Sequence, residues 1–267
     1  MTGIVQQNVL TFAALDDIAF AASRGRLVGG VPRHIAGDLG PVIEMVQLAR
    51  AGLLPLPTSA PWLHLNGSEA LLQAAVGNAG CWLSKQGGGA GAFKCKLMVS
   101  DAKSWTSFKV EAHKAGLTAG FSAQTVHRLM GAMVEIVDNV LEHSEAAPTG
   151  FVVFSGHPGS FEFTVADAGV GTLASLQTNS EYAYLRDEGD ALQCALADGE
   201  SRFGKAAKRG TGFSQLFKSL VSLNASLRFR SGDHGLSMQG TSPTLVNAHV
   251  AKKPRASGFM TSVRCTM

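Results

Sequence analysis

Met133-Val-Glu-Ile-Val-Asp-Asn-Val-Leu-Glu-His143 is the most informative stretch of the sequence, because it combines a polar stripe with an apolar side on one predicted helix. At 3.6 residues per turn, one narrow stripe holds Glu135, Asn139, Glu142 and His143. The opposite side is apolar and holds Leu129, Met133, Ile136, Val137, Val140 and Leu141. Such a helix can pack on a sheet while its polar stripe faces a cavity. Taken alone, the pattern fits equally a surface helix with solvated polar groups.

Composition and charge place few limits on function. The chain has 267 residues, of which 45% are hydrophobic and 16% charged, as in ordinary globular proteins. Its 23 Lys and Arg exceed its 20 Asp and Glu too little to favour nucleic acid or an anionic membrane as a partner. Four separated cysteines without a C-x-x-C pair suggest neither a zinc site nor a disulfide framework. With no signal peptide and no apolar run of about 20 residues, we expect a cytoplasmic protein.

Residues 1–104 are expected to form a small α/β region without a chemical motif. Helical spacing covers 10–24, 42–51 and 69–76, with Ser68 as the expected N-cap of the third helix. Short strands are expected at 62–65 and 93–99. We interpret this region as a structural or partner-binding module.

Residues 105–267 are expected to form an α+β domain in which a sheet and helices make two layers. Helices are predicted over 105–115 and over 123–141, the second capped by Ser122. Strands are predicted at 151–154, 161–165, 226–230, 236–239 and 258–264. In the strand 226–230, alternation would turn Leu227 and Phe229 inward, and the Ser and Arg residues outward.

Asp167-Ala-Gly-Val-Gly171 directly follows a predicted strand. This order places a carboxylate at the floor of a pocket while glycines let the backbone turn closely around a ligand. A carboxylate accepts a hydrogen bond from an exocyclic amine such as adenine N6, whereas it repels a phosphate. The alternative is a tight turn with an Asx cap.

Residues 172–208 form a polar stretch that looks like a mobile cover, and Arg209-Gly-Thr-Gly212 follows it. A glycine-rich turn that leads into a helix presents free backbone N–H groups, which can hold phosphates. The motif is not a P-loop, because G-x-x-x-x-G-K-[ST] does not occur in the sequence.

Three motifs together resemble a known family. Glu135-x-x-x-Asn139, Asp167-x-Gly169-x-Gly171 and Gly210-x-Gly212 are similar to the N box and the two glycine boxes of the GHKL ATPase superfamily. That superfamily includes gyrase B subunits, MutL proteins, histidine kinases and anti-sigma-factor kinases. The resemblance covers residues 105–267 and implies a Bergerat-type ATP-binding fold, with the region 1–104 as an addition.

The resemblance also implies a role for each matching residue. Asn139 would hold Mg²⁺, Asp167 would bind the adenine amine, and Glu135 would act as the general base of hydrolysis. The base pocket would include Gly169 and Gly171, with Thr261 behind the adenine. His143 would supply a basic group near the phosphates. The phosphates would lie against Gly210, Thr211 and Gly212, under a lid over 173–209 that carries Lys205, Lys208 and Arg209.

Two departures from the family pattern concern Phe213, where leucine is usual, and Ser257-Gly258-Phe259, where the family usually has Gly-Thr. Three functions stay open. The first is a slow Mg-ATPase or nucleotide switch that controls a regulatory protein partner, and the second is an anti-sigma-like serine/threonine kinase. The third is a nucleotide-sensing interaction module without turnover. A homodimer is also left open.

Overall fold

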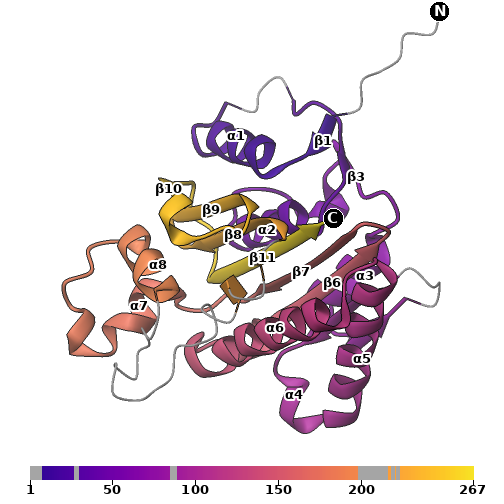
Figure 1. Cartoon of the computed structure of the whole chain (residues 1–267). Helices are drawn as coiled ribbons and strands as arrows, with labels where there is room; N and C mark the ends of the chain where they lie inside the picture. Colours follow the sequence, from indigo (N-terminus) through magenta and orange to yellow (C-terminus); the bar gives the residue numbers. More distant parts are fainter. Residues whose placement is uncertain (1–7, 27–29, 85–88, 198–215, 218–219, 221–222) are drawn as a thin grey trace, which may run out of the picture.

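The computed structural model describes residues 8–26, 30–84, 89–197, 216–217, 220 and 223–267. Its centre is an eight-stranded sheet in the order β10-β9-β8-β11-β7-β6-β5-β4, in which every neighbouring pair is antiparallel (Figure 1). Its strands are β4 (Cys81–Leu83), β5 (Ala90–Lys94), β6 (Phe151–His157), β7 (Ser160–Ala166), β8 (Asn224–Ser231), β9 (His234–Thr241), β10 (His249–Lys252) and β11 (Phe259–Thr266).

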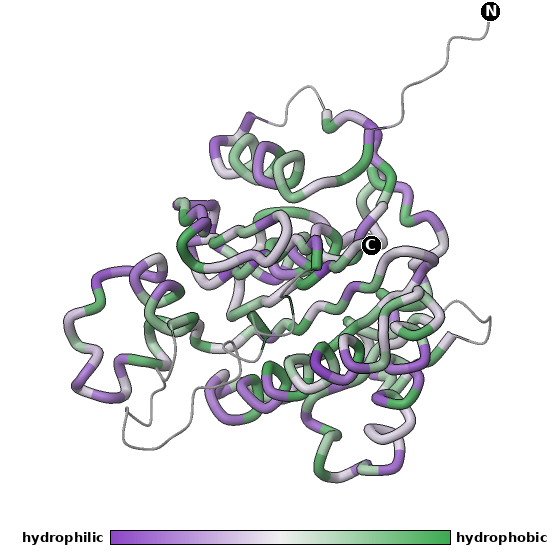
Figure 2. The backbone as a smooth tube through the Cα atoms, in the orientation of Figure 1, coloured by the Kyte–Doolittle hydropathy of each residue, from purple (hydrophilic) through white to green (hydrophobic). Residues whose placement is uncertain are grey.

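One face of the sheet is covered by the helices α5 (Ala102–Thr118) and α6 (Ala123–His143). Ser122 precedes α6 as its N-cap, and its hydroxyl accepts the backbone N–H of Thr125, which confirms the predicted cap. Hydrophobic and hydrophilic residues alternate along α6 in Figure 2, as expected for an amphipathic helix. Its apolar side meets the sheet in a core that includes Val126, Ile136 and Phe163.

The other face of the sheet is covered by the helices α2 (Leu39–Arg50) and α3 (Glu69–Val76). Phe151 and Val153 share a second hydrophobic cluster with Ile43 and Met45 of α2. Since Val152 and Phe154 belong to the first core, β6 is apolar on both faces and needs a cover on each. The expected mixture of helices and a sheet is therefore confirmed. The helices on the second face, α2 and α3, both lie in the region 1–104 that we expected as an addition to the two-layer domain.

The expected division near residue 104 does not coincide with a break in the sheet, because β4 and β5 precede that residue. The first part of the chain also contains a parallel three-stranded sheet of β1 (Asn8–Leu10), β2 (His34–Ala36) and β3 (Leu63–His64). Helix α1 (Phe12–Ser23) follows β1 and lies on the same side as α2 (Figure 1).

Two local predictions in this region were wrong. The strand predicted over 93–99 ends at Lys94, and the short helix α4 (Leu97–Ser100) follows, since Leu97 and Met98 pack on the core as a helical turn. Ser68 precedes α3, but its hydroxyl donates to the carbonyl of Leu65 and does not cap the helix.

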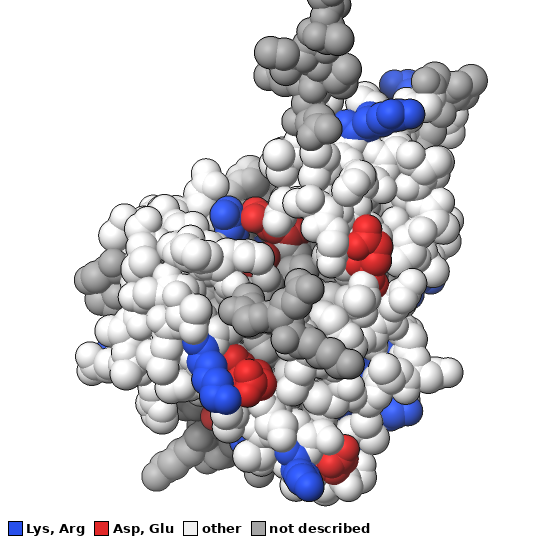
Figure 3. Space-filling view, turned by 90° about the vertical axis from the view of Figure 1, so that its right-hand side faces the viewer, with Lys and Arg blue, Asp and Glu red and all other residues white. Residues whose placement is uncertain are grey.

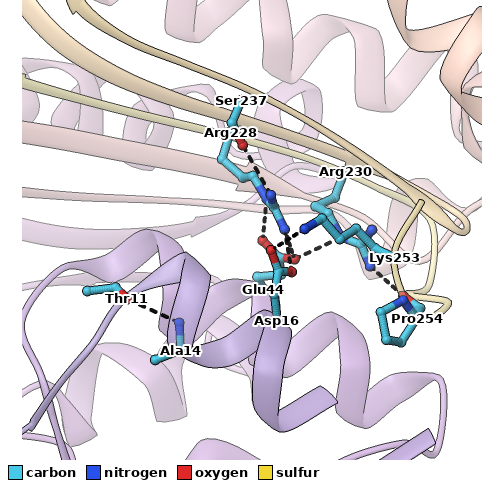
Figure 4. Close-up of polar contacts among 9 residues, drawn as sticks. All are labelled: Thr11, Ala14, Asp16, Glu44, Arg228, Arg230, Ser237, Lys253 and Pro254. Atoms are coloured by element: carbon cyan, nitrogen blue, oxygen red, sulfur yellow. Dashed lines mark hydrogen bonds and ion pairs between the residues drawn. The ribbon is translucent and has the colours of Figure 1, made fainter. Parts of the chain in front are cut away.

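The charged side chains on the face shown in Figure 3 are scattered, and several basic groups stand beside acidic ones. A further set of charges is buried between the sheet and α2 (Figure 4). Arg228, which we expected to point outward, is 3% exposed, and Arg230 is 1% exposed. Alternation assigned both arginines correctly to one face of β8, but α1 and α2 cover that face.

Glu44 of α2 is the centre of this buried network (Figure 4). Its carboxylate accepts two hydrogen bonds from Arg228, at 2.9 and 2.8 Å, and lies 2.8 Å from Nε of Arg230. Arg228 also donates to Asp16 at 2.8 Å, and Asp16 pairs with Lys253 at 2.6 Å. Pairing of this kind is required when charges are removed from water. Because Asp16 lies in α1, Glu44 in α2 and both arginines in β8, the network also connects these two helices to the sheet.

The cover expected over 172–208 is described as far as residue 197. It forms α7 (Gly171–Gln177) and α8 (Glu188–Leu196), which stand apart from the other helices in Figure 1. Short 3₁₀ turns occur at Pro57–Ser59, Ala147–Thr149, Ser180–Tyr182 and Leu245–Asn247. No helix among the described residues is both long enough and apolar enough to cross a membrane.

Candidate functional site

Asp167 lies directly after β7, and its side chain is 2% exposed. Its carboxylate accepts the backbone N–H of Gly169 at 2.7 Å and also that of Phe259. Burial raises the pKa of Asp167 to about 6, although these two hydrogen bonds and the nearby charge of Arg50 act in the opposite direction. The carboxyl group is therefore mostly ionised at neutral pH, as an acceptor for an amine requires.

Gly169 brings the Asp167 loop against the end of α6. A Cβ atom at Gly169 would lie 2.7 Å from the carbonyl carbon of Ser144, closer than real Cβ contacts come. The next residue, Val170, donates its N–H to the same carbonyl at 3.0 Å. The Asp167 loop therefore packs against the end of the helix that carries Glu135 and Asn139.

The polar stripe of α6 leads toward this contact. Glu135 and Glu142 are exposed, whereas Asn139 and His143 are half-buried. Nε2 of His143 lies 4.0 Å from the carboxylate of Glu142. Asn139 precedes Ser144 by five residues, which is about 7.5 Å along the helix axis. The stripe is thus partly open to solvent.

Thr261 of β11 pairs with Val165 of β7 and with Phe229 of β8. The side chain is fully buried, and its hydroxyl has no hydrogen-bond partner among the described residues. Buried hydroxyls are normally paired, so this group is suited to a ligand or a water molecule. Thr261 lies two residues along β11 from Phe259, whose backbone bonds to Asp167.

Gly258, directly before β11, lies against the Asp167 loop. Its φ of +60° favours glycine, and a Cβ atom there would lie 2.7 Å from the carbonyl carbon of Asp167. The glycine therefore allows the start of β11 to approach the Asp167 loop closely.

Gly171 has a φ of +82° and begins α7. Beyond it, the N–H of Thr172 donates to the hydroxyl of Ser231 at 2.8 Å. The carboxylate of Glu188 accepts from that hydroxyl at 2.6 Å and from the N–H of Leu173 at 3.1 Å. These bonds attach α7 and α8 to the end of β8. Sequence reasoning missed Glu188, whose only local signal is its place in the first turn of a helix.

Sequence reasoning also missed Gln47 and Arg50 of α2. Gln47 is fully buried, and its side-chain amide donates to the carbonyl of Asp167 and, at 2.8 Å, to that of Ser257. Arg50 donates to Oε1 of Gln47 at 3.0 Å and to the carbonyl of Thr149 at 3.3 Å. The first hundred residues thus reach the backbone of the candidate site.

The predicted phosphate-binding part falls outside the described residues. It comprises Lys205, Lys208, Arg209, Gly210, Thr211 and Gly212. Phe213, the departure that follows these residues, also lies outside the described part of the chain. Within the described part of the chain, no group of three or more His, Cys, Asp and Glu residues could hold a metal ion. A magnesium ion held by Asn139 and by nucleotide phosphates does not need such a group.

No protein-family model matches the chain. No curated protein matches it either.

Proposed function

We propose that the protein binds Mg-ATP in the corner between the Asp167 loop and the end of α6, in the manner of GHKL-type ATPases. The bound nucleotide would act as a switch for a regulatory protein partner, with slow hydrolysis resetting the switch. The close contact between Gly169 and Ser144 carries this proposal, since it joins the candidate base site to the helix that holds Asn139 and Glu135.

The groups at the corner suit an adenine base. The ionised carboxylate of Asp167 accepts a hydrogen bond, and the hydroxyl of Thr261 can donate one. Asp167 directly follows β7 and Thr261 lies in the neighbouring strand β11, and the edge of adenine offers both an amine donor and ring-nitrogen acceptors. These observations support a base with an exocyclic amine over a purely anionic ligand.

The magnesium and phosphate groups would lie along the polar stripe of α6. Asn139 is half-buried and offers an amide oxygen, which is a suitable Mg²⁺ ligand. Magnesium would neutralise phosphate charge at this position. Glu135 lies one helical turn before Asn139 and is exposed, so it can reach a water molecule near the phosphates. We assign it the role of general base.

Helices α7 and α8 would transmit the nucleotide state to a protein partner. They begin at Gly171, within the second predicted motif, and Glu188 attaches them to the sheet. A ligand that moves the Asp167 loop would therefore also move the start of α7. This supports a switch whose nucleotide state is transmitted through the cover.

Calorimetry with ATP and Mg²⁺ tests the proposal on wild type and Asp167→Asn. We expect binding by the wild type and at least about ten-fold weaker binding by the variant, because a hydrogen bond to a charged acceptor is lost. Asp17→Asn, at an exposed position of α1, is the matched control and should bind like the wild type. Equal affinity of wild type and Asp167→Asn would contradict the assignment of the base pocket.

A further inference from the structure

The contacts of Gln47 concern the same loop that the proposed function uses for the adenine base. The loop leaves β7 at Asp167, and its backbone carbonyl there would ordinarily be expected to bond within the sheet. Instead, that carbonyl accepts from the side-chain amide of Gln47, on a helix 120 residues earlier in the chain.

The same amide also holds the start of β11. Gln47 donates to the carbonyl of Ser257 at 2.8 Å, and the N–H of Ser257 donates to the backbone carbonyl of Gln47 at 3.2 Å. A single buried side chain therefore fixes the two segments that meet at Asp167 and Gly258. Because both acceptors are backbone groups, the amide sets the position of the loop itself.

Arg50, one turn further along α2, reaches the loop by a second route. Its guanidinium donates to the carbonyl of Thr149, whose hydroxyl accepts the N–H of Ala168 at 2.9 Å. The guanidinium also lies over the ring of Phe151, 5.3 Å from its centroid, which restricts its orientation. Asp167 and Ala168 are thus held through two neighbouring turns of α2.

We infer that α2 belongs to the nucleotide site, with Gln47 and Arg50 as positioning residues that hold Asp167 in place to bind the exocyclic amine of adenine. This inference rests on the proposed function and deepens it, since it makes base selectivity depend on the first hundred residues. Neither residue touches the nucleotide. Their effect passes through the backbone of Asp167 and Ala168 and, for Arg50, also through its charge near the Asp167 carboxylate.

Base selectivity separates positioning from a general structural role. Inosine triphosphate carries a carbonyl where ATP carries the amine, so only ATP can donate to Asp167 there. If Gln47 positions Asp167, Gln47→Met should weaken ATP binding while binding of inosine triphosphate changes little. The ratio of the two affinities should fall about ten-fold, the effect expected for one hydrogen bond to a charged acceptor. Loss of general stability would lower both affinities together and leave the ratio unchanged.

The experiment measures the Kd values of ATP and inosine triphosphate, with Mg²⁺ and at pH 8, for wild type, Gln47→Met and Arg50→Met. Gln73→Met, at an exposed position of α3, is the matched control. Arg50 is only half-buried, so Arg50→Met tests the inference even if Gln47→Met does not fold. A wild type that binds ATP, combined with an unchanged ratio in the folded variants, overturns the inference alone. A wild type that binds no ATP overturns the proposed function and the inference with it.

Discussion

Gly169 packs so closely on Ser144 that a Cβ atom at Gly169 would lie 2.7 Å from the carbonyl carbon and 2.8 Å from Cβ of Ser144. The neighbouring hydrogen bond from Val170 to the carbonyl of Ser144 holds the two segments in this position. The loop and the end of α6 therefore cannot accommodate a side chain at residue 169 without moving apart.

Gly169→Ala should consequently destabilise the fold by about 1–3 kcal/mol and weaken ATP binding, since the loop must shift away from α6. Gly131→Ala is the matched control, because a Cβ atom there meets nothing within 4 Å. As Gly131 lies inside α6, its replacement by Ala should stabilise the protein by about 0.5–1 kcal/mol. Urea unfolding of both variants measures the difference, and effects of the same sign would contradict the packing argument.

Glu44→Gln should destabilise the protein by about 3–5 kcal/mol, because it leaves Arg228 and Arg230 buried without their shared anion. Glu111→Gln removes an exposed carboxylate that pairs with Lys114, and should cost no more than about 1 kcal/mol. Chemical denaturation at neutral pH compares the two. A cost for Glu44→Gln as small as that for Glu111→Gln would show that water reaches the buried network.

Local patterns were sufficient to predict the elements that carry the candidate site. The 3.6-residue spacing and Ser122 predicted α6, and the alternation in Phe161-Glu-Phe-Thr-Val165 predicted β7. Alternation also assigned Arg228 and Arg230 to a common face of β8. It could not show that this face is covered, because the covering helices lie in a distant part of the chain. The apolar run at 151–154, buried on both faces, was the available signal.

Gln47 shows the limit of sequence reasoning at the site. Its partners, Asp167 and Ser257, lie 120 and 210 residues away, and one glutamine on a helix gives no local sign of such contacts. The sequence also gives no local sign of the contacts of Glu162. It is the third residue of β7, and its carboxylate accepts the N–H groups of Leu39 and Gly40 at the start of α2. Only the packing of α2 on β7 creates this cap.

Glu162 should make the stability of the protein decrease as the pH rises. Burial raises its pKa from 4.5 to about 8 in the folded state, so between these values the folded state keeps a proton that the unfolded chain releases. The contribution is fully present below pH 4.5 and is lost as the pH approaches 8, by up to about 1.4 kcal/mol per pH unit.

The measurement is urea unfolding from pH 5 to pH 8.5 for wild type and Glu162→Gln, which cannot ionise. The stability of the variant relative to the wild type should rise across this range. Glu69→Gln, in the exposed first turn of α3, is the control and should follow the wild type. A constant difference between Glu162→Gln and wild type would mean that Glu162 has an ordinary pKa.

Asp167 should make base selectivity depend on pH. With a pKa of about 6, its carboxylate is ionised at pH 8 and accepts from the amine of ATP, whereas at pH 5 it is protonated and can donate to the carbonyl of inosine triphosphate. The preference for ATP should therefore decrease as the pH falls through 6. Binding titrations with both nucleotides at each pH measure this preference as the ratio of the two Kd values. Because both nucleotides carry the same triphosphate, ionisation of the phosphates affects both Kd values alike and leaves the ratio unchanged. A preference independent of pH would place the base away from Asp167.

Glu135 distinguishes a hydrolase from a protein that only binds nucleotide. Its carboxylate is exposed one turn before Asn139, so Glu135→Gln should leave the Kd of Mg-ATP unchanged while turnover falls by about 10²–10⁴-fold, the usual contribution of a general base. Glu142→Gln, an exposed carboxylate on the same stripe of α6, should keep its turnover. Phosphate release and transfer of labelled phosphate to added proteins are measured together. Free phosphate as the only product favours the ATPase, labelled protein favours the kinase, and unchanged turnover in Glu135→Gln removes Glu135 as the base.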